Sequence, residues 1–204
     1  GVLSITQGKA HVCDECLQCG HCIAICPQAA PSISVYSDEL IEYHSETFDI
    51  PTQNMLNTIK FRRSVRQFKE QLLSYDDLHL LIDAAAHTPT AKNAQACRFV
   101  FIQDSLEDFK RTIWSNLRSA FEEQRELPIP RESVQNFLNL REGEHPQDYL
   151  FRNAPAVLCI QAPDPVDAGL AASAIEMVGT TLGIGVLYNG YLRRTIAAME
   201  DIQA

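Results

Sequence analysis

The sequence predicts an α+β protein, an α/β sandwich of helices and strands that follows a small cysteine-rich segment. Short apolar runs that suit buried strands alternate with longer runs of helical periodicity in the last three quarters of the chain. Five of the seven cysteines crowd into residues 13–26. The composition changes at a polar connector, residues 45–54. We therefore place one domain at residues 1–45 and a second at residues 46–204.

Periodicity and end signals predict the elements of the larger domain. Ser74 with Asp77 three residues later is a capping signal, and Pro89 cannot continue the helix that follows. In chain order we expect helix 55–63, a helix from Ser74 to before Pro89, strand 98–103, a helix capped by Ser105 to about residue 126, helix 131–140, strand 156–161, helix 166–182, a brief strand 186–188 and helix 191–199.

The bulk composition is that of a folded chain with a sizeable core. Its 204 residues are 46% hydrophobic and 21% charged. The net charge of −9 argues against a nucleic-acid partner, because such proteins need a basic surface to meet phosphate. The apolar stretch 168–187 carries Glu176 and many small residues, which favours a buried helix over a membrane span. With no signal peptide visible, we expect a cytoplasmic protein without a membrane partner.

The strongest motif is Cys-x2-Cys-x2-Cys-x3-Cys-Pro, formed by Cys16, Cys19, Cys22 and Cys26. Ferredoxins hold a [4Fe–4S] cluster with this run. Closely spaced thiolates can wrap one face of the cluster, while loop amides point at its sulfides. The alternative is a structural zinc site, but zinc sites usually combine two separated Cys-x2-Cys pairs. The spacing therefore favours an iron–sulfur cluster.

The fourth cluster ligand is open to two interpretations. In two-cluster ferredoxins the last cysteine of such a run ligates the other cluster, and this chain, with seven cysteines, has no second motif. Either Cys13 supplies the missing thiolate, or a further motif precedes Gly1. Residues 2–12 resemble the connector between the two motifs of a bacterial ferredoxin, which favours the second interpretation.

Three further motifs follow in order. Arg62, Arg63, Ser64 and Arg66 place three guanidiniums and a hydroxyl in five residues of an acidic chain, a pattern that suits a phosphate. Standing alone, that run could equally be a solvated helix end. Residues 89–95 read PTAKNAQ directly before a predicted strand, and residues 182–190 read LGIGVLYNG after the small-residue helix.

This order resembles the nitroreductase family of FMN enzymes, and the cysteine-rich segment in front of it resembles the ferredoxin–nitroreductase fusions of anaerobic microbes. The resemblance implies that the phosphate and ribityl chain of FMN are held by Arg62, Arg63, Ser64 and Arg66. It implies that the flavin is lined from the partner subunit by Pro89, Thr90, Ala91 and Asn93, with Gln95 nearby. It implies that the N5/O4 edge faces the backbone of Tyr188, Asn189 and Gly190.

The resemblance also implies a sandwich fold, a homodimer with FMN at the interface, and a flavin-dependent oxidoreductase. A low-potential donor, ferredoxin or reduced nicotinamide, would reduce the cluster. FMN would then pass electrons to a small acceptor such as a nitroaromatic or a quinone, without a protein nucleophile. The alternative is a non-enzymatic electron-transfer or FMN-binding protein. Measuring turnover with such acceptors would distinguish this alternative from an enzyme.

Two departures from the family pattern stand out. Cys97 occupies a position where members often have tryptophan, and we expect it to fill the core. Members also normally continue past the position of Ala204 with a strand and a basic tail that completes the phosphate site. We therefore expect that the sequence is cut at both ends, with its FMN affinity depending on the missing tail.

Overall fold

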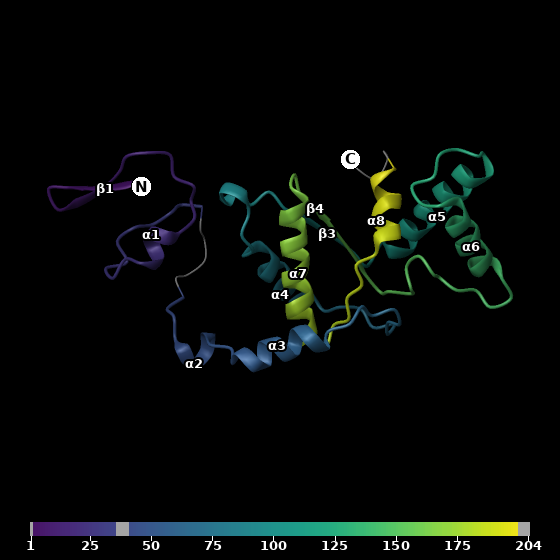
Figure 1. Ribbon diagram of the computed structural model, residues 1–204, viewed down its shortest axis with the longest axis horizontal. Helices are drawn as coiled ribbons and strands as arrows, with labels where there is room; N and C mark the ends of the chain where they lie inside the picture. The colour runs from purple at the N-terminus through teal and green to yellow at the C-terminus, as the bar shows by residue number, and fades with distance from the viewer. Residues whose placement is uncertain (1, 36–40, 200–204) are drawn as a thin grey trace. The chain divides into compact units, whose positions relative to one another are not determined.

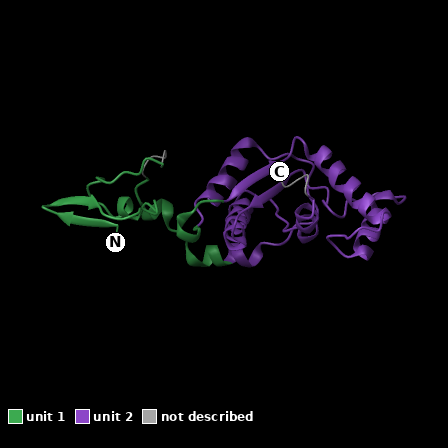
Figure 2. Ribbon diagram, turned by 90° about the horizontal axis from the view of Figure 1, so that it is seen from above, with its two compact units in different colours: residues 1–56, 89–96 green, residues 57–88, 97–204 purple. Residues whose placement is uncertain are grey.

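The computed structural model describes residues 2–35 and 41–199, and Figure 1 labels most of its helices and strands. The chain divides into two compact units, coloured separately in Figure 2. The first unit comprises residues 1–56 together with 89–96, and the second comprises residues 57–88 and 97–204. The first unit therefore includes a short segment from much later in the chain.

The first unit begins with an antiparallel hairpin of β1 (Leu3–Thr6) and β2 (Lys9–Val12). Its two turn residues, Gln7 and Gly8, have φ of 53° and 75°, and glycine adopts such values without strain. The cysteine-rich loop that follows contains the single helical turn α1 (His21–Ala24). The hairpin occupies the part of the chain that resembled a ferredoxin connector.

The other described elements follow in chain order, and β3 and β4 lie in the larger unit (Figure 1). They are α2 (Ser45–Phe48), α3 (Thr52–Phe61), α4 (Tyr75–Ala86), the 3-10 turn η1 (Ala91–Asn93), β3 (Arg98–Ile102), α5 (Leu106–Glu122), α6 (Arg131–Glu142), β4 (Val157–Gln161), α7 (Pro165–Thr181) and α8 (Gly190–Ala197). This mixed helix and sheet content confirms the α+β prediction.

Helix ends follow the expected chemistry in α4 but not in α5. The Ser74 hydroxyl accepts from the Asp77 amide at 3.1 Å, which satisfies one free N–H of the first turn. Ser105 stands at the cap position of α5 but makes no side-chain cap bond, so that detail of the prediction was wrong. Here φ is −94° and ψ is 14°, not the extended geometry that directs a serine hydroxyl at the first turn.

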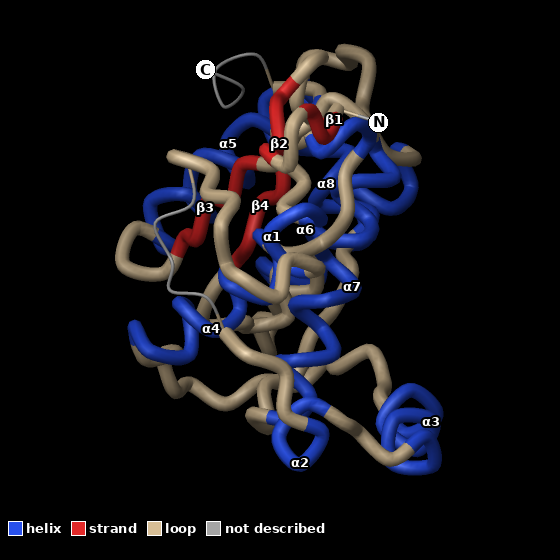
Figure 3. The backbone as a smooth tube through the Cα atoms, turned by 90° about the vertical axis from the view of Figure 1, so that its left-hand side faces the viewer, coloured by secondary structure: helices blue, strands red, loops and turns tan. Residues whose placement is uncertain are grey.

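One core lies between the strand pair and the helices α4 and α7. β3 and β4 run antiparallel with Val100 opposite Cys159, side by side in Figure 3. Alternate residues of each strand pack towards buried Leu81 of α4 and Ile175 of α7, as strand geometry requires. Cys97 packs against the same cluster, which agrees with its expected role as a core residue.

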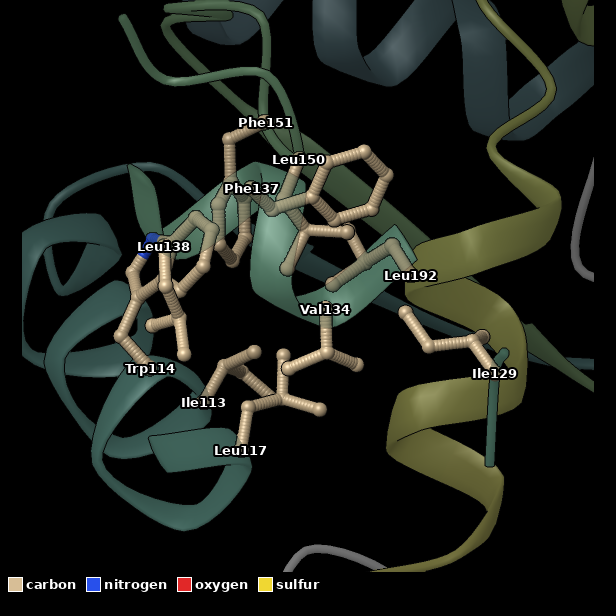
Figure 4. Close-up of a cluster of buried hydrophobic side chains, with 10 residues drawn as sticks. All are labelled: Ile113, Trp114, Leu117, Ile129, Val134, Phe137, Leu138, Leu150, Phe151 and Leu192. Carbon is tan, nitrogen blue, oxygen red and sulfur yellow. The ribbon is translucent and has the colours of Figure 1, made fainter. Parts of the chain in front are cut away.

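A second core joins α5, α6 and α8 (Figure 4). Its most deeply buried side chains are Ile113 and Leu117 from α5, Val134 from α6 and Leu150 from the loop before β4. Leu192 brings in α8, so the chain directly after residues 188–190 is held by this core. In the described residues, no helix is both long and apolar enough to cross a membrane.

Candidate functional site

The cysteine-rich loop has backbone geometry that presents amides to sulfur. The Gln18 amide donates to Cys16 Sγ at 3.3 Å, and Gln18 and Gly20 both have positive φ. Amides of Ala30, then Gln28, hold the pKa of the Cys26 thiol below its usual 9.0. Amide hydrogen bonds of this kind stabilise thiolate, the form that binds metal.

The thiols themselves are not gathered. Cys13, Cys16 and Cys19 are exposed, and Cys22 and Cys26 are partly exposed. Across residues 2–35 and 41–199, no three Cys, His, Asp or Glu side chains approach closely enough to hold a metal ion. The Cys13 thiol donates to the Val2 carbonyl at 3.2 Å. The donor chemistry therefore suits a cluster, but its closed geometry is not present and the predicted iron–sulfur segment is not confirmed.

Residues 89–96 form a tight, hydrogen-bonded segment within the first unit. Lys92, Asn93 and Gln95 have φ of 53°, 54° and 47°, a conformation that L-residues adopt rarely. The Gln95 amide donates to Thr90 Oγ1 at 2.9 Å, and Gln95 Nε2 donates to Asn93 Oδ1 at 3.0 Å. Of the predicted flavin residues, Pro89 opens this segment and Ala91 begins η1. These hydrogen bonds therefore hold the side chains of Asn93 and Gln95 in one orientation.

The amide of Asn93 reaches the cysteine-rich loop. Its Nδ2 donates to the carbonyls of both Leu17 and Gln18, each at 3.0 Å. These carbonyls lie between Cys16 and Cys19. Two predicted sites, one for a cluster and one for a flavin, are therefore joined by hydrogen bonds inside the first unit.

The arginine run lies directly after α3, in the second unit. Arg63 Nη1 donates to the carbonyls of Lys60 and Arg62, and Arg66 Nη1 donates to the Ser64 carbonyl at 3.3 Å. Among the described residues, neither Arg63 nor Arg66 has a carboxylate partner. A guanidinium has five N–H donors, so most remain available to an anion. Their chemistry fits a phosphate group.

Arg62 differs from its neighbours because its charge is already paired. Its Nη1 lies 3.3 Å from Glu176 Oε1, and Glu176 of α7 is only 6% exposed. Tyr188 also hydrogen bonds with Glu176. The Arg62–Glu176–Tyr188 cluster links the arginine run, the small-residue helix and the 184–190 segment. The phosphate role of Arg62 remains a prediction, and the contact that its guanidinium makes here is the ion pair with Glu176.

The Tyr188 phenol is expected to titrate well above an ordinary tyrosine. Burial, then the charge of Glu176 and its hydrogen bond, raise the pKa of Tyr188 from 10.0 to about 12. A raised folded-state pKa contributes stability that is complete below pH 10 and is lost as the pH rises towards 12. Phenolate absorbance of the wild type minus Tyr188→Phe should show this midpoint, and an ordinary midpoint near 10 would contradict it.

Residues 184–190 run beside the arginine run without forming a strand, so the predicted strand 186–188 was wrong. One backbone bond, from the Val65 amide to the Val186 carbonyl at 3.0 Å, links the two segments. An isolated bond builds no ladder. The contact is nevertheless close, because a Cβ on Gly185 would lie 2.7 Å from Val65 Cγ2.

Asn189 holds the start of α8. Its Oδ1 accepts from the Leu192 amide at 2.9 Å, and its Nδ2 donates to the Leu150 carbonyl. The side chain therefore acts as a helix cap, and a ligand at residues 188–190 would meet the backbone there and not the Asn189 amide. This arrangement is compatible with a backbone role at a flavin edge.

The structure thus brings the arginine run and residues 184–190 together in the second unit, and the cysteine-rich loop and residues 89–96 together in the first. Two surface hollows of about 380 and 300 Å³ lie elsewhere, around Ile129 and around Trp114. Sequence reasoning missed Glu176 as a partner of Arg62. The available signal was an acidic residue, Glu176, among the apolar and small residues of the stretch 168–187.

The sequence is similar to those of known proteins. A model of the Nitroreductase family matches residues 59–202. The chain is 22% identical over 151 residues to the "FMN reductase (NADPH)" of Bacillus subtilis, a match that covers 73% of this chain and 59% of that protein. The chain therefore spans less than two thirds of the length of this curated relative.

Solved structures with the same fold include two nitroreductases with bound FMN. The protein from Bacteroides fragilis has a TM-score of 0.58 and 20% identity, over 74% of this chain and 77% of that chain. The protein from Desulfitobacterium hafniense has a TM-score of 0.54 and 24% identity, over 71% and 73% of the two chains. At these identities the likeness establishes the fold.

Proposed function

The chain belongs to the nitroreductase family, and from that premise we propose that it is part of an FMN-dependent oxidoreductase in which a [4Fe–4S] cluster on the N-terminal segment supplies electrons to FMN. The acceptor would be a small oxidised molecule such as a nitroaromatic or a quinone. FMN, when bound, supplies the redox chemistry. The protein's own residues would bind and orient it.

One observation carries the FMN assignment. Arg63 and Arg66 have no carboxylate partner among the described residues, although the chain carries a net charge of −9. Unpaired guanidiniums beside the 184–190 segment fit a phosphate dianion. We propose that Arg63, Ser64 and Arg66 hold the phosphate, that Arg62 holds the ribityl side through its pairing with Glu176, and that the backbone at 188–190 faces the flavin.

The cluster assignment is supported by the cysteine spacing and by the amide donated to Cys16 Sγ. Metal binding often completes the folding of its own site, so ungathered thiols in the cluster-free chain are compatible with it. We propose Cys16, Cys19, Cys22 and Cys26 as ligands, with Cys13 as the alternative fourth ligand. Ferredoxin or reduced nicotinamide would be the electron donor.

A homodimer with FMN at its interface is part of the same proposal. Exposed apolar side chains lie on α3, where Ile59 is 49% and Phe61 79% exposed, and on α7, where Val166 and Leu170 are exposed. In the proposed dimer these exposed apolar side chains would be covered by the partner subunit. Residues 89–96, including Pro89, Thr90, Ala91, Asn93 and Gln95, would line the flavin of the partner subunit.

The proposal is tested on anaerobically purified full chain after incubation with iron, sulfide and FMN. We expect bound flavin and iron with sulfide in equal amounts, and turnover with a nitroaromatic or quinone once a donor is added. Protein that takes up neither cofactor would refute the proposal. Uptake without turnover would instead support the non-enzymatic alternative.

Replacing Arg66 by alanine is expected to weaken FMN binding about tenfold, the loss of one charge-assisted hydrogen bond. Fluorescence titration of FMN measures this directly. Lys69→Ala is the matched control, since Lys69 is an exposed cation of the same segment outside the motif. Equal weakening in both variants would show that net charge, not the motif, determines binding.

A further inference from the structure

Both N–H donors of the Asn93 side-chain amide are used in hydrogen bonds within the protein. Its NH2 group has two donor hydrogens, and it faces two carbonyl oxygens, those of Leu17 and Gln18, at 3.0 Å each. Its Oδ1 accepts from Gln95 Nε2 at 3.0 Å. The amide orientation is therefore determined at both ends.

The two acceptor carbonyls belong to the peptides that separate Cys16 from Cys19. The same short stretch carries the Gln18 amide, which donates to Cys16 Sγ at 3.3 Å, and Gln18 itself has φ of 54°. A loop with this left-handed residue needs outside support to keep its amide aimed at sulfur. Asn93 supplies two contacts to this loop from far along the chain.

We infer that Asn93 is a positioning residue for the cysteine-rich loop: its amide pins the peptides between Cys16 and Cys19 and so keeps the Gln18 N–H on Cys16 Sγ. The inference rests on the proposed function for its redox consequence, because an N–H bond to a cluster thiolate stabilises the reduced state. Asn93 then connects the flavin-lining segment to the electron-supplying loop.

Asn93 and Lys92 both have a positive φ, so glycine can replace either residue without changing the backbone. Asn93 sits at φ 54°, so Asn93→Gly removes the amide and leaves that conformation accessible, whereas alanine would add backbone strain. Asn93→Asp keeps the shape and the acceptor towards Gln95, but it turns an oxygen to the two carbonyls. Lys92→Gly is the control, because Lys92 has φ of 53° and lies outside the predicted site.

The first measurement needs no cofactor. In reduced, cluster-free full chain, the iodoacetamide labelling rate of Cys16 and Cys19 is followed by peptide mass spectrometry, with Cys159 as internal reference. We expect Asn93→Gly and Asn93→Asp to label Cys16 on the order of fivefold to tenfold more slowly than wild type, because the Gln18 amide no longer holds that sulfur in its reactive thiolate form. Lys92→Gly should label at the wild-type rate.

The second measurement uses chain reconstituted with iron and sulfide. Redox titration followed by the electron paramagnetic resonance signal of the reduced cluster should give a more negative midpoint in Asn93→Gly than in wild type or Lys92→Gly. Labelling rates or a midpoint unchanged in Asn93→Gly would overturn the inference. Wild-type chain that assembles no cluster would overturn the proposed function and the redox role of Asn93, while the labelling rates would still decide whether Asn93 pins the loop.

Discussion

Arg62→Ala is expected to lower the free energy of unfolding by about 2–3 kcal/mol, because it leaves a buried carboxylate without its cation. Glu176 is 6% exposed, and its Oε1 lies 3.3 Å from Arg62 Nη1. Tyr188 would remain as a hydrogen-bond partner. The expected loss of stability is therefore smaller than it would be if Glu176 were left with no partner at all. Urea denaturation of wild type and variant measures the difference.

Arg66→Ala is the matched control for this prediction. Its Nη1 donates only to the neighbouring Ser64 carbonyl among the described contacts, so its removal should cost less than about 0.5 kcal/mol. Arg62→Ala combined with Glu176→Gln should recover much of the lost stability, since the buried charge is removed with its partner. If Arg62→Ala and Arg66→Ala were equally stable, the Arg62–Glu176 pair would contribute nothing to the stability of the fold.

Gly185→Ala is expected to destabilise the second unit by about 2–3 kcal/mol through overpacking. The new Cβ would lie 2.7 and 2.9 Å from the two methyl carbons of Val65 and 2.9 Å from its Cβ. Rotating the valine cannot relieve the contact with its Cβ, so the backbone must move. Movement would strain the bond between the Val65 amide and the Val186 carbonyl.

Gly169→Ala is the control for Gly185→Ala, because we expect it to raise the stability of the protein and not to lower it. Gly169 lies inside α7, and a Cβ there meets nothing within 4 Å. The substitution should stabilise by about 0.5–1 kcal/mol, because alanine loses less backbone freedom in a helix. Val65→Ala in the Gly185→Ala background should restore part of the stability. A harmless Gly185→Ala would mean that the two segments do not pack as described.

Under the proposed function, Gly185→Ala should also weaken FMN binding, because the arginine run and the backbone at 188–190 would no longer hold their relative positions. Arg62→Ala should do the same through the loss of the Glu176 contact. FMN titration at a temperature where each variant remains folded separates this effect from unfolding. Affinity retained in Gly185→Ala would count against a flavin shared by the two segments.

Local chemistry determined much of what the sequence revealed. The Ser74 cap, the short apolar run of β3 and the small-residue run of α7 each act over a few residues, so their patterns are visible in the chain. The family motifs are short for the same reason. Cys97 could likewise be predicted as a core residue because its neighbours form a buried strand.

Tertiary structure alone decided how these pieces interact. Arg62 and Glu176 are 114 residues apart, and Asn93 and Leu17 are 76 apart, so no local pattern could pair them. Residues 186–188 have strand-like composition, yet a strand needs a neighbour in register, and only one bond is available there. Long-range pairing depends on the whole packed chain, which is why the partners of the motif residues could not be read from the motifs.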